Sequence, residues 1–234
     1  MSGLLETRNL SRDFGGLKAV SHVDFELGQG EIRALIGPNG AGKTTFVNLL
    51  CGRIEPSEGQ VVFDGADISK LPAHKRIALG MAYTFQITSV FARLSVRENV
   101  ALAVRRRDGN VDRDVPEALE RVGLLERIDE SAGDLSYGHQ RLLEIAMGLA
   151  QKPRLLILDE PTQGLAEGEI EAFCQLVRSL APKTTVLLIE HNMNVVMDLA
   201  ERITVLNFGS VLAEGTPDDI RANPDVQAAY LGTT

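Results

Sequence analysis

The chain has 234 residues, 44% of them hydrophobic, and a formal net charge of −8 at pH 7. This length allows one large α/β domain, or one domain with a small insertion. The acidic balance disfavours a nucleic-acid surface, because such surfaces usually carry a basic stripe. No stretch reaches the roughly 18 consecutive apolar residues that favour a membrane span. We therefore expect any role at a membrane to depend on a partner.

Strands and helices are predicted to alternate along most of the chain. Strands are expected at 4–9, 20–27, 32–36, 60–63, 81–85, 155–159, 184–189 and 203–207, and helices at 44–52, 72–79, 98–106, 114–122, 139–150, 167–180 and 193–200. Alternation of this kind implies parallel strands joined by helical crossovers. Strand signals stop between 87 and 133, which predicts a mostly helical lobe inserted into an α/β core formed by 1–86 and about 134–234. The whole of 1–234 is predicted as a single domain.

The segment GPNGAGKT at 37–44 fits the phosphate-binding loop pattern. A buried strand precedes it and a helical pattern follows it, so backbone N–H groups and a positive helix end would point at one phosphate chain. Lys43 is expected to reach the outer phosphates of a nucleotide. The hydroxyl of Thr44 is expected to bind Mg²⁺.

A second strand, RLLILDE at 154–160, ends in two carboxylates. Four consecutive aliphatic residues are typical of a central parallel strand covered on both faces. Such a strand delivers its last residues to the ligand crevice at the carboxyl edge of the sheet. Asp159 is therefore predicted to hold Mg²⁺, and Glu160 to polarise the water that attacks the γ-phosphate.

The segment LSYGH at 135–139 stands directly before a helix. Alone, Ser136 would be interpreted as a helix cap. With the other segments, the whole chain resembles the nucleotide-binding subunit of ATP-binding cassette transporters, and LSYGHQRLLEIAMGLA is similar to the family's signature motif. This resemblance implies roles for Gln86 as the link to the helical lobe, for His191 as the γ-phosphate sensor, and for Phe14 as the ring that stacks on adenine.

The motifs and the resemblance together predict a P-loop ATPase core with a mixed, mainly parallel sheet, an antiparallel N-terminal β subdomain and the helical lobe. The cofactors are ATP and Mg²⁺. The predicted catalytic residues are Lys43, Gln86, Glu160 and His191, and the predicted metal ligands are Thr44, Gln86 and Asp159. ATP binding is assigned to Phe14, Gly37, Pro38, Asn39, Gly40, Ala41, Gly42, Lys43, Thr44, Thr45, Ser136 and Gly138.

The resemblance also implies partners. In the family the signature of one subunit closes over the nucleotide held by another, so hydrolysis is expected to need a second cassette, identical or similar. Permease subunits are expected to dock on the helical lobe, where Val90, Phe91, Leu94 and Val96 form an apolar group. The chain would lie at the cytoplasmic face of the inner membrane, and no nucleic-acid partner is expected.

Several stretches, among them FGGLKAV and the segment from Glu190 to Gly232, resemble branched-chain amino-acid importers. LPAHKR also resembles the ATPase that extracts lipopolysaccharide, so that alternative stays open. A non-transport cassette is disfavoured because the 49 residues at 87–135 leave no room for a long coiled coil. Two positions depart from the family pattern: His139 replaces a glutamine, and Ala166 replaces an aspartate whose loss would loosen coupling between two sites.

Overall fold

The computed structural model describes residues 3–84 and 89–231. Its central feature is a six-stranded sheet in the order β10-β9-β3-β8-β7-β6. Every neighbouring pair in it is parallel except β9 and β10, which form an antiparallel hairpin. The strands are β3 (Ile32–Ile36), β6 (Met81–Thr84), β7 (Leu155–Asp159), β8 (Thr185–Ile189), β9 (Arg202–Asn207) and β10 (Ser210–Gly215). The predicted mixed, mainly parallel sheet is confirmed.

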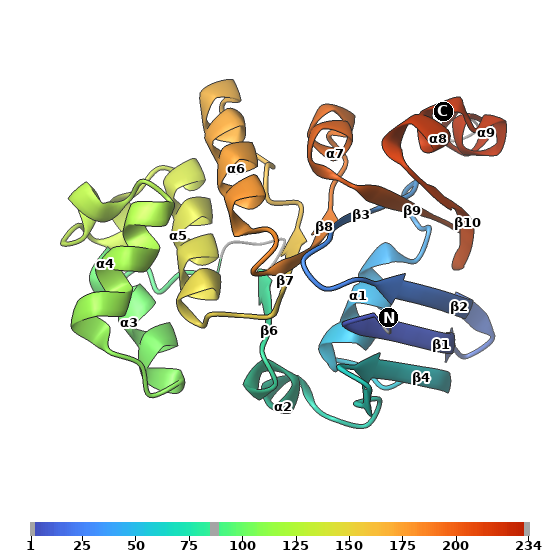
Figure 1. The fold of residues 1–234 in the computed structure, drawn as a ribbon, viewed down its shortest axis with the longest axis horizontal. Coiled ribbons are helices and arrows are strands. Elements are labelled where there is room, and N and C mark those ends of the chain that lie inside the picture. Colours follow the sequence, from blue (N-terminus) through green and yellow to red (C-terminus); the bar gives the residue numbers. More distant parts are fainter. Residues whose placement is uncertain (1–2, 85–88, 232–234) are drawn as a thin grey trace.

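A smaller antiparallel sheet in the order β2-β1-β4-β5 lies against one side of this core (Figure 1). Its strands are β1 (Leu5–Phe14), β2 (Leu17–Leu27), β4 (Glu58–Phe63) and β5 (Ala66–Asp67). The first two run longer than predicted and meet at the turn after Phe14. The two-residue strand β5 was not predicted, because its length carries no periodic signal.

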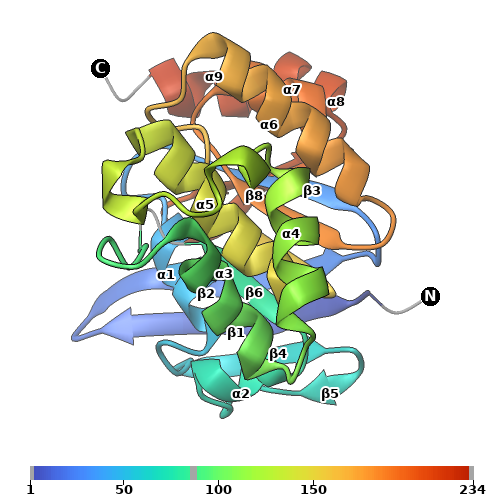
Figure 2. The same ribbon diagram turned by 90° about the vertical axis from the view of Figure 1, so that its left-hand side faces the viewer.

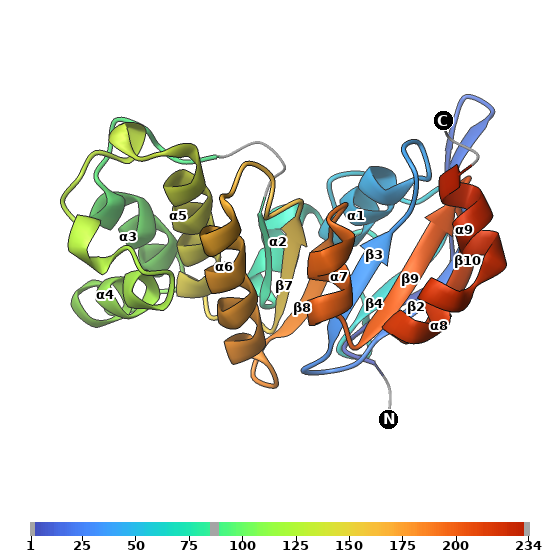
Figure 3. The ribbon, with the colours of Figure 1, turned by 90° about the horizontal axis from the view of Figure 1, so that it is seen from above.

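Helices cover both faces of the central sheet, and alternate residues of β7 enter different cores. Leu156 and Leu158 pack with α5, α6 and the lobe, whereas Leu155 and Ile157 pack with α1 and the antiparallel sheet. A strand buried on both faces is apolar throughout, which accounts for its run of four aliphatic residues. The core helices are α1 (Lys43–Cys51), α2 (Ala73–Ala78), α5 (Tyr137–Ala150), α6 (Glu167–Leu180), α7 (Met193–Leu199), α8 (Pro217–Ala222) and α9 (Pro224–Leu231). Figure 3 shows α5, α6 and α7 in a row along the sheet.

The helical lobe consists of α3 (Val96–Arg106), α4 (Val111–Arg121) and two single-turn 3₁₀ helices, packed beside α5 (Figure 2). Ser95 caps α3 in a reciprocal capping box with Glu98. The buried Asp114 pairs with Arg107, Arg113 and Lys152, and thereby joins the lobe to the loop that follows α5.

The apolar group expected on the lobe surface is only partly exposed. Phe91 is 53% exposed, and Val90 and Leu94 are half-buried. The expectation for Val96 is wrong: it is the first residue of α3 and is fully buried in the lobe's core. A residue on the inner side of a capped helix faces its packing partner, so the exposed part of the group centres on Phe91.

Candidate functional site

The phosphate-binding loop links β3 to α1, and two of its glycines are required by close backbone contacts. A Cβ atom on Gly37 would lie 2.2 Å from the carbonyl oxygen of Leu206, and one on Gly42 would lie 2.4 Å from that of Ala19. Their φ angles are 154° and 100°, values that other residues rarely adopt. The loop is therefore held between β2 and β9 by contacts that no side chain would permit.

Lys43 lies at the base of this loop, with its residue only 8% exposed. Its Nζ donates to the carbonyl oxygens of Gly37 at 2.5 Å and Pro38 at 3.1 Å. Burial lowers the pKa of the Lys43 ammonium, while the charges of Glu160 and Asp159 oppose that shift. The ammonium therefore lies close to two carboxylates and is fixed by the loop that would hold a phosphate chain.

A cavity of about 410 Å³ opens beside the loop, and we call it the nucleotide cavity. Predicted residues that line it are Asn39, Gly40, Ala41, Gly42, Lys43, Thr44, Thr45, Asp159, Glu160 and His191. Residues that the sequence analysis missed are Leu17, Lys18, Ala19, Ile189, Phe208 and Gly209. The missed residues come mainly from two hairpin turns, whose position beside the loop has no local sequence signal.

One end of the nucleotide cavity is apolar. Leu17 is 70% exposed and Phe208 is 86% exposed, and both line it. The turn that carries Phe208 is fixed to the phosphate loop, because the N–H of Gly209 donates to the carbonyl of Ala41 at 2.9 Å. An exposed aromatic ring held in this way is suited to contact a nucleotide base or ribose.

The other end of the cavity carries the two carboxylates. Asp159 Oδ2 accepts a hydrogen bond from the hydroxyl of Tyr83 at 2.7 Å. Burial raises the pKa of the Asp159 carboxyl, and the bond from Tyr83 opposes that shift. Glu160 Oε1 lies 2.9 Å from Nε2 of His191. The structure thus brings Lys43, Asp159, Glu160 and His191 together from three separate segments.

The backbone at Glu160 is in the left-handed region, with φ of 47°, a conformation that costs an ordinary residue about 1 kcal/mol or more. Its N–H donates to the carbonyl of Ile189 at 2.8 Å. Its carbonyl accepts from Arg141 of α5 at 2.9 Å. These bonds from two neighbouring elements hold the carboxylate in place despite the strain.

Glu190 is a further residue that the sequence analysis missed. It is 4% exposed. One carboxylate oxygen accepts from the N–H and hydroxyl of Thr162, and the other accepts from the N–H groups of His191 at 2.7 Å and Asn192 at 2.9 Å. Glu190 thereby joins the loop after Glu160 to the segment that carries His191.

The remaining predicted residues lie elsewhere. Ser136 caps α5 by accepting from the N–H of His139 at 3.2 Å, and neither Ser136 nor Gly138 belongs to the described lining of the nucleotide cavity. Phe14 is also outside that described lining; the guanidinium of Arg12 lies 4.6 Å from the centre of its ring. The carbonyl oxygens of Gly37 and Pro38 accept hydrogen bonds from Lys43. Gln86 lies outside the described residues, so its predicted role is not tested.

The residues present fit a magnesium ion bound together with a nucleotide. No group of three or more described His, Cys, Asp or Glu side chains could hold a metal on its own. Mg²⁺ usually takes only one or two protein oxygens and completes its shell with phosphate oxygens and water. Thr44 and Asp159, which line the same cavity as the phosphate loop, supply ligands of that kind.

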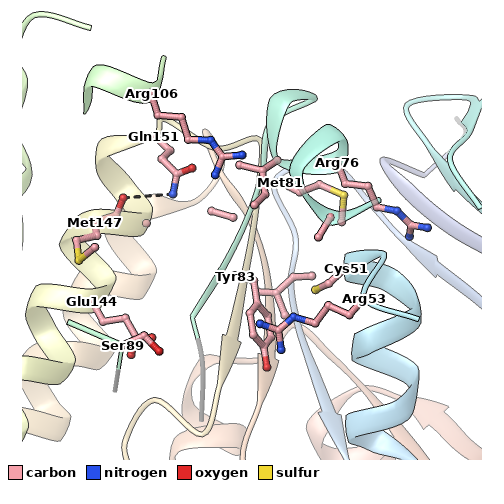
Figure 4. A pocket seen from close by; sticks show the side chains of 15 residues that line it. Cys51, Arg53, Arg76, Met81, Tyr83, Ser89, Arg106, Glu144, Met147 and Gln151 are labelled. Atoms are coloured by element: carbon pink, nitrogen blue, oxygen red, sulfur yellow. Dashed lines mark hydrogen bonds between the residues drawn. The ribbon is translucent and has the colours of Figure 1, made fainter. Parts of the chain in front are cut away.

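A second cavity, of about 310 Å³, lies between α2, β6 and α5, and we call it the groove (Figure 4). Its lining is mainly apolar, with arginines from three elements. The lining side chains are Cys51, Arg53, Ala73, Arg76, Ile77, Met81, Ala82, Tyr83, Ser89, Arg106, Glu144, Met147, Gln151 and Ile157, with Gly148 beside them. In Figure 4, Arg106 and Gln151 lie on the side of the groove opposite Arg76 and Cys51, and the side chains of Tyr83 and Arg53 lie together below Met81.

No helix in the described ranges has the length and apolar character needed to cross a membrane.

Comparison of the sequence with family models gives two matches. The model described as "ABC transporter" matches residues 20–163, and the model described as "Branched-chain amino acid ATP-binding cassette transporter" matches residues 210–234.

Among curated proteins, the chain is 40% identical to the high-affinity branched-chain amino acid transport ATP-binding protein BraF of Pseudomonas aeruginosa. It is 41% identical to LivG of Escherichia coli, which carries the same description. Each alignment covers 98% of this chain and 98% of the relative.

Solved structures give the same result. The ADP conformation of MJ1267, an ATP-binding cassette of an ABC transporter, has a TM-score of 0.90 at 29% identity, covering 99% of this chain and 100% of that one. A dimeric post-hydrolysis state of the cassette MJ0796, bound to ADP and phosphate, has a TM-score of 0.82 at 26% identity, covering 91% and 98%.

Proposed function

Since the chain belongs to the ATP-binding cassette transporter family, we propose that it binds and hydrolyses ATP to drive a branched-chain amino-acid importer. The observation that carries the proposal is the convergence of Lys43, Asp159, Glu160 and His191 on one cavity beside the phosphate loop. The solute class rests on full-length likeness to BraF and LivG and on the match of the C-terminal segment.

The proposed reaction is transfer of the γ-phosphoryl group of ATP to water. Glu160 orients the water, and Lys43 balances the charge that develops on the outer phosphate oxygens. The 2.9 Å contact between Glu160 and His191 supports a role for His191 in holding both the carboxylate and the γ-phosphate. Mg²⁺, held by Thr44 and Asp159, would supply further charge neutralisation when bound.

A second cassette is part of this proposal. Ser136 and Gly138 lie outside the described lining of the nucleotide cavity. In an ATP sandwich they would instead contact the γ-phosphate held by the facing subunit, using the N-terminus of α5 as an anion-binding end. A dimer of the related cassette MJ0796 supports this arrangement.

We assign the groove to a short helical segment of a permease subunit. The groove is lined mainly by apolar groups, a character typical of docking surfaces. Arg53 and Arg106 line it, so an acidic residue or a helix C-terminus on the partner would complement its charge. Phe91 follows Ser89 of the groove closely in the chain and would extend the contact onto the lobe. The chain would then lie at the cytoplasmic face of the membrane, bound through its permease.

The experiment is leucine uptake by cells that lack this chain's gene. Restoring the wild-type chain should restore ATP-dependent uptake, while restoring Glu160→Gln should not, although the variant reaches the membrane in equal amount. Uptake that stays normal in the deletion, with no other cassette compensating, would reject the amino-acid assignment.

A further inference from the structure

The groove and the nucleotide cavity have no described lining residue in common, but hydrogen bonds connect their linings. Tyr83 of β6 lines the groove, while its hydroxyl donates to Oδ2 of Asp159 in the nucleotide cavity at 2.7 Å. The guanidinium of Arg53, also in the groove, lies 4.7 Å from the centre of the Tyr83 ring. Figure 4 shows the guanidinium of Arg53 lying against the ring of Tyr83. One tyrosine therefore lines the groove and is hydrogen-bonded to a carboxylate of the nucleotide cavity.

A second connection runs through α5. Glu144 lines the groove, and its Oε2 accepts from Nη1 of Arg141 at 2.7 Å. Nη2 of the same guanidinium donates to the carbonyl oxygens of Asp159 at 2.5 Å and Glu160 at 2.9 Å. Arg141 and Glu144 are 1% and 6% exposed. The pair thus spans from the groove to the backbone of Asp159 and Glu160.

These contacts are suited to transmit a displacement. Separating a buried ion pair leaves an uncompensated charge, so Arg141 must follow a shift of Glu144. The carbonyls that Arg141 holds flank Glu160, whose φ of 47° depends on neighbouring contacts. A carboxylate displaced by about 1 Å from its productive position costs about two orders of magnitude in rate.

We propose that Tyr83 and the Arg141–Glu144 pair couple the groove to hydrolysis, so that a permease segment seated in the groove sets the positions of Asp159 and Glu160. Tyr83, Arg141 and Glu144 act here as positioning residues. The inference rests on the proposed function, because it requires that the permease docks in the groove. Its test must therefore separate loss of docking from loss of coupling.

The test measures ATP turnover of the chain with increasing amounts of its permease in lipid nanodiscs. Two quantities are read: the stimulation at saturating permease, and the permease concentration that gives half of it. Tyr83→Phe removes only the hydroxyl, so we expect stimulation to fall about twofold to thirtyfold, the range of energetic coupling between sites. The half-saturating concentration and the affinity for ATP should stay as in wild type.

Ile77→Ala is the matched control, because Ile77 also lines the groove and no described hydrogen bond links its side chain to the carboxylates. It should raise the half-saturating permease concentration and leave the saturating stimulation unchanged. An unchanged half-saturating concentration would reject docking in the groove, and with it the proposed partner site. Normal docking with full stimulation in Tyr83→Phe would reject the tyrosine's part in coupling.

The ion pair is tested by the double variant Arg141→Met with Glu144→Met. Replacing both partners of a buried pair by apolar side chains of similar size is often neutral for stability, whereas a single replacement leaves the other charge buried without its partner. We expect the double variant to bind ATP and permease as wild type does and to lose at least threefold in stimulation. Wild-type stimulation in this variant and in Tyr83→Phe would overturn the inference.

Discussion

The nucleotide cavity and the groove are connected by a hydrogen bond between Tyr83 and Asp159, but they differ in how they are built. The nucleotide cavity is formed by a strand–loop–helix unit and by residues at the ends of β7 and β8, and its charged groups belong to short continuous motifs. The groove is formed where α2, β6 and α5 pack together, and its lining comes from single residues spread between Cys51 and Ile157. The charged residues of the nucleotide cavity can be recognised in continuous sequence segments. The residues of the groove come together only in the folded chain.

This difference predicts different responses to substitution. A residue of the nucleotide cavity acts on phosphate charge at short range, where one donor is worth a large factor in rate. A residue of the groove or lobe that contacts only the partner should have no effect on turnover when the partner is absent.

Lys43→Ala should lower ATP turnover by about 100-fold to 1000-fold, the usual cost of one preorganised donor to a developing anion. The ammonium of Lys43 is held by the carbonyls of Gly37 and Pro38, at the loop expected to receive the phosphates. Phosphate release measured with and without permease should show the same loss in both conditions. Near-normal turnover, free of contaminating ATPase, would be incompatible with the assigned site.

Phe91→Asp should weaken binding to the permease by about tenfold or more, as expected when an exposed aromatic residue of an interface is replaced by a charged one. Phe91 is 53% exposed, so the free energy of unfolding should change by no more than about 0.5 kcal/mol. Co-purification from mild-detergent membranes measures the binding. Leu102→Asp is the matched control, since Leu102 lies on the same lobe at 41% exposure; an equal loss in both variants would argue against a specific contact.

Phe208→Ala should raise the KM for ATP about fivefold and leave kcat unchanged, because base stacking contributes at least about 1 kcal/mol. Binding of inorganic tripolyphosphate, which lacks the base and ribose, should not change. Isothermal titration of both ligands separates the two cases. If tripolyphosphate binding weakens as much as ATP binding, Phe208 acts on the phosphate loop and not on the base.

Much of the fold and of the phosphate end of the site could be predicted from sequence. GPNGAGKT and RLLILDE combine a buried strand with a functional end, so periodicity and motif agree on the same positions. The helix α5 begins at Tyr137, two residues before the predicted start at His139. Ser136 caps the helix, as the pattern alone indicates, and the helix follows the cap directly. The sequence predicts Val96 in an exposed apolar group, but the structure buries it. An apolar residue at a helix start has the same sequence signature whether it faces solvent or a packing partner.

The side chains that support the motifs could not be predicted. Glu190 joins Thr162 to His191, and Arg141 joins α5 to the carbonyl of Glu160. Each residue contacts a segment at some distance in the sequence, and the two segments meet only when the central sheet has formed. Arg141 lies in the segment that resembles the signature motif, but the sequence analysis gives it no role. Glu190 directly precedes His191 and was given no role either, so only the folded structure shows what these two residues hold. Phe208 was missed for the same reason, because its turn contacts the phosphate loop through tertiary packing alone.

In the proposed function this chain is one half of an ATP sandwich, and the molecular mass of the Glu160→Gln variant in the presence of nucleotide tests this. This variant should bind Mg²⁺-ATP without cleaving it. Because the paired form is expected to bind ATP more tightly than the single subunit, ATP should shift the equilibrium toward the dimer. Light scattering after size exclusion should give a dimer with ATP, a monomer with ADP, and a monomer with ATP when Ser136→Arg is added. If the Glu160→Gln protein is saturated with ATP and stays monomeric, alone and when mixed with its partner cassette, then two cassettes do not enclose ATP between them.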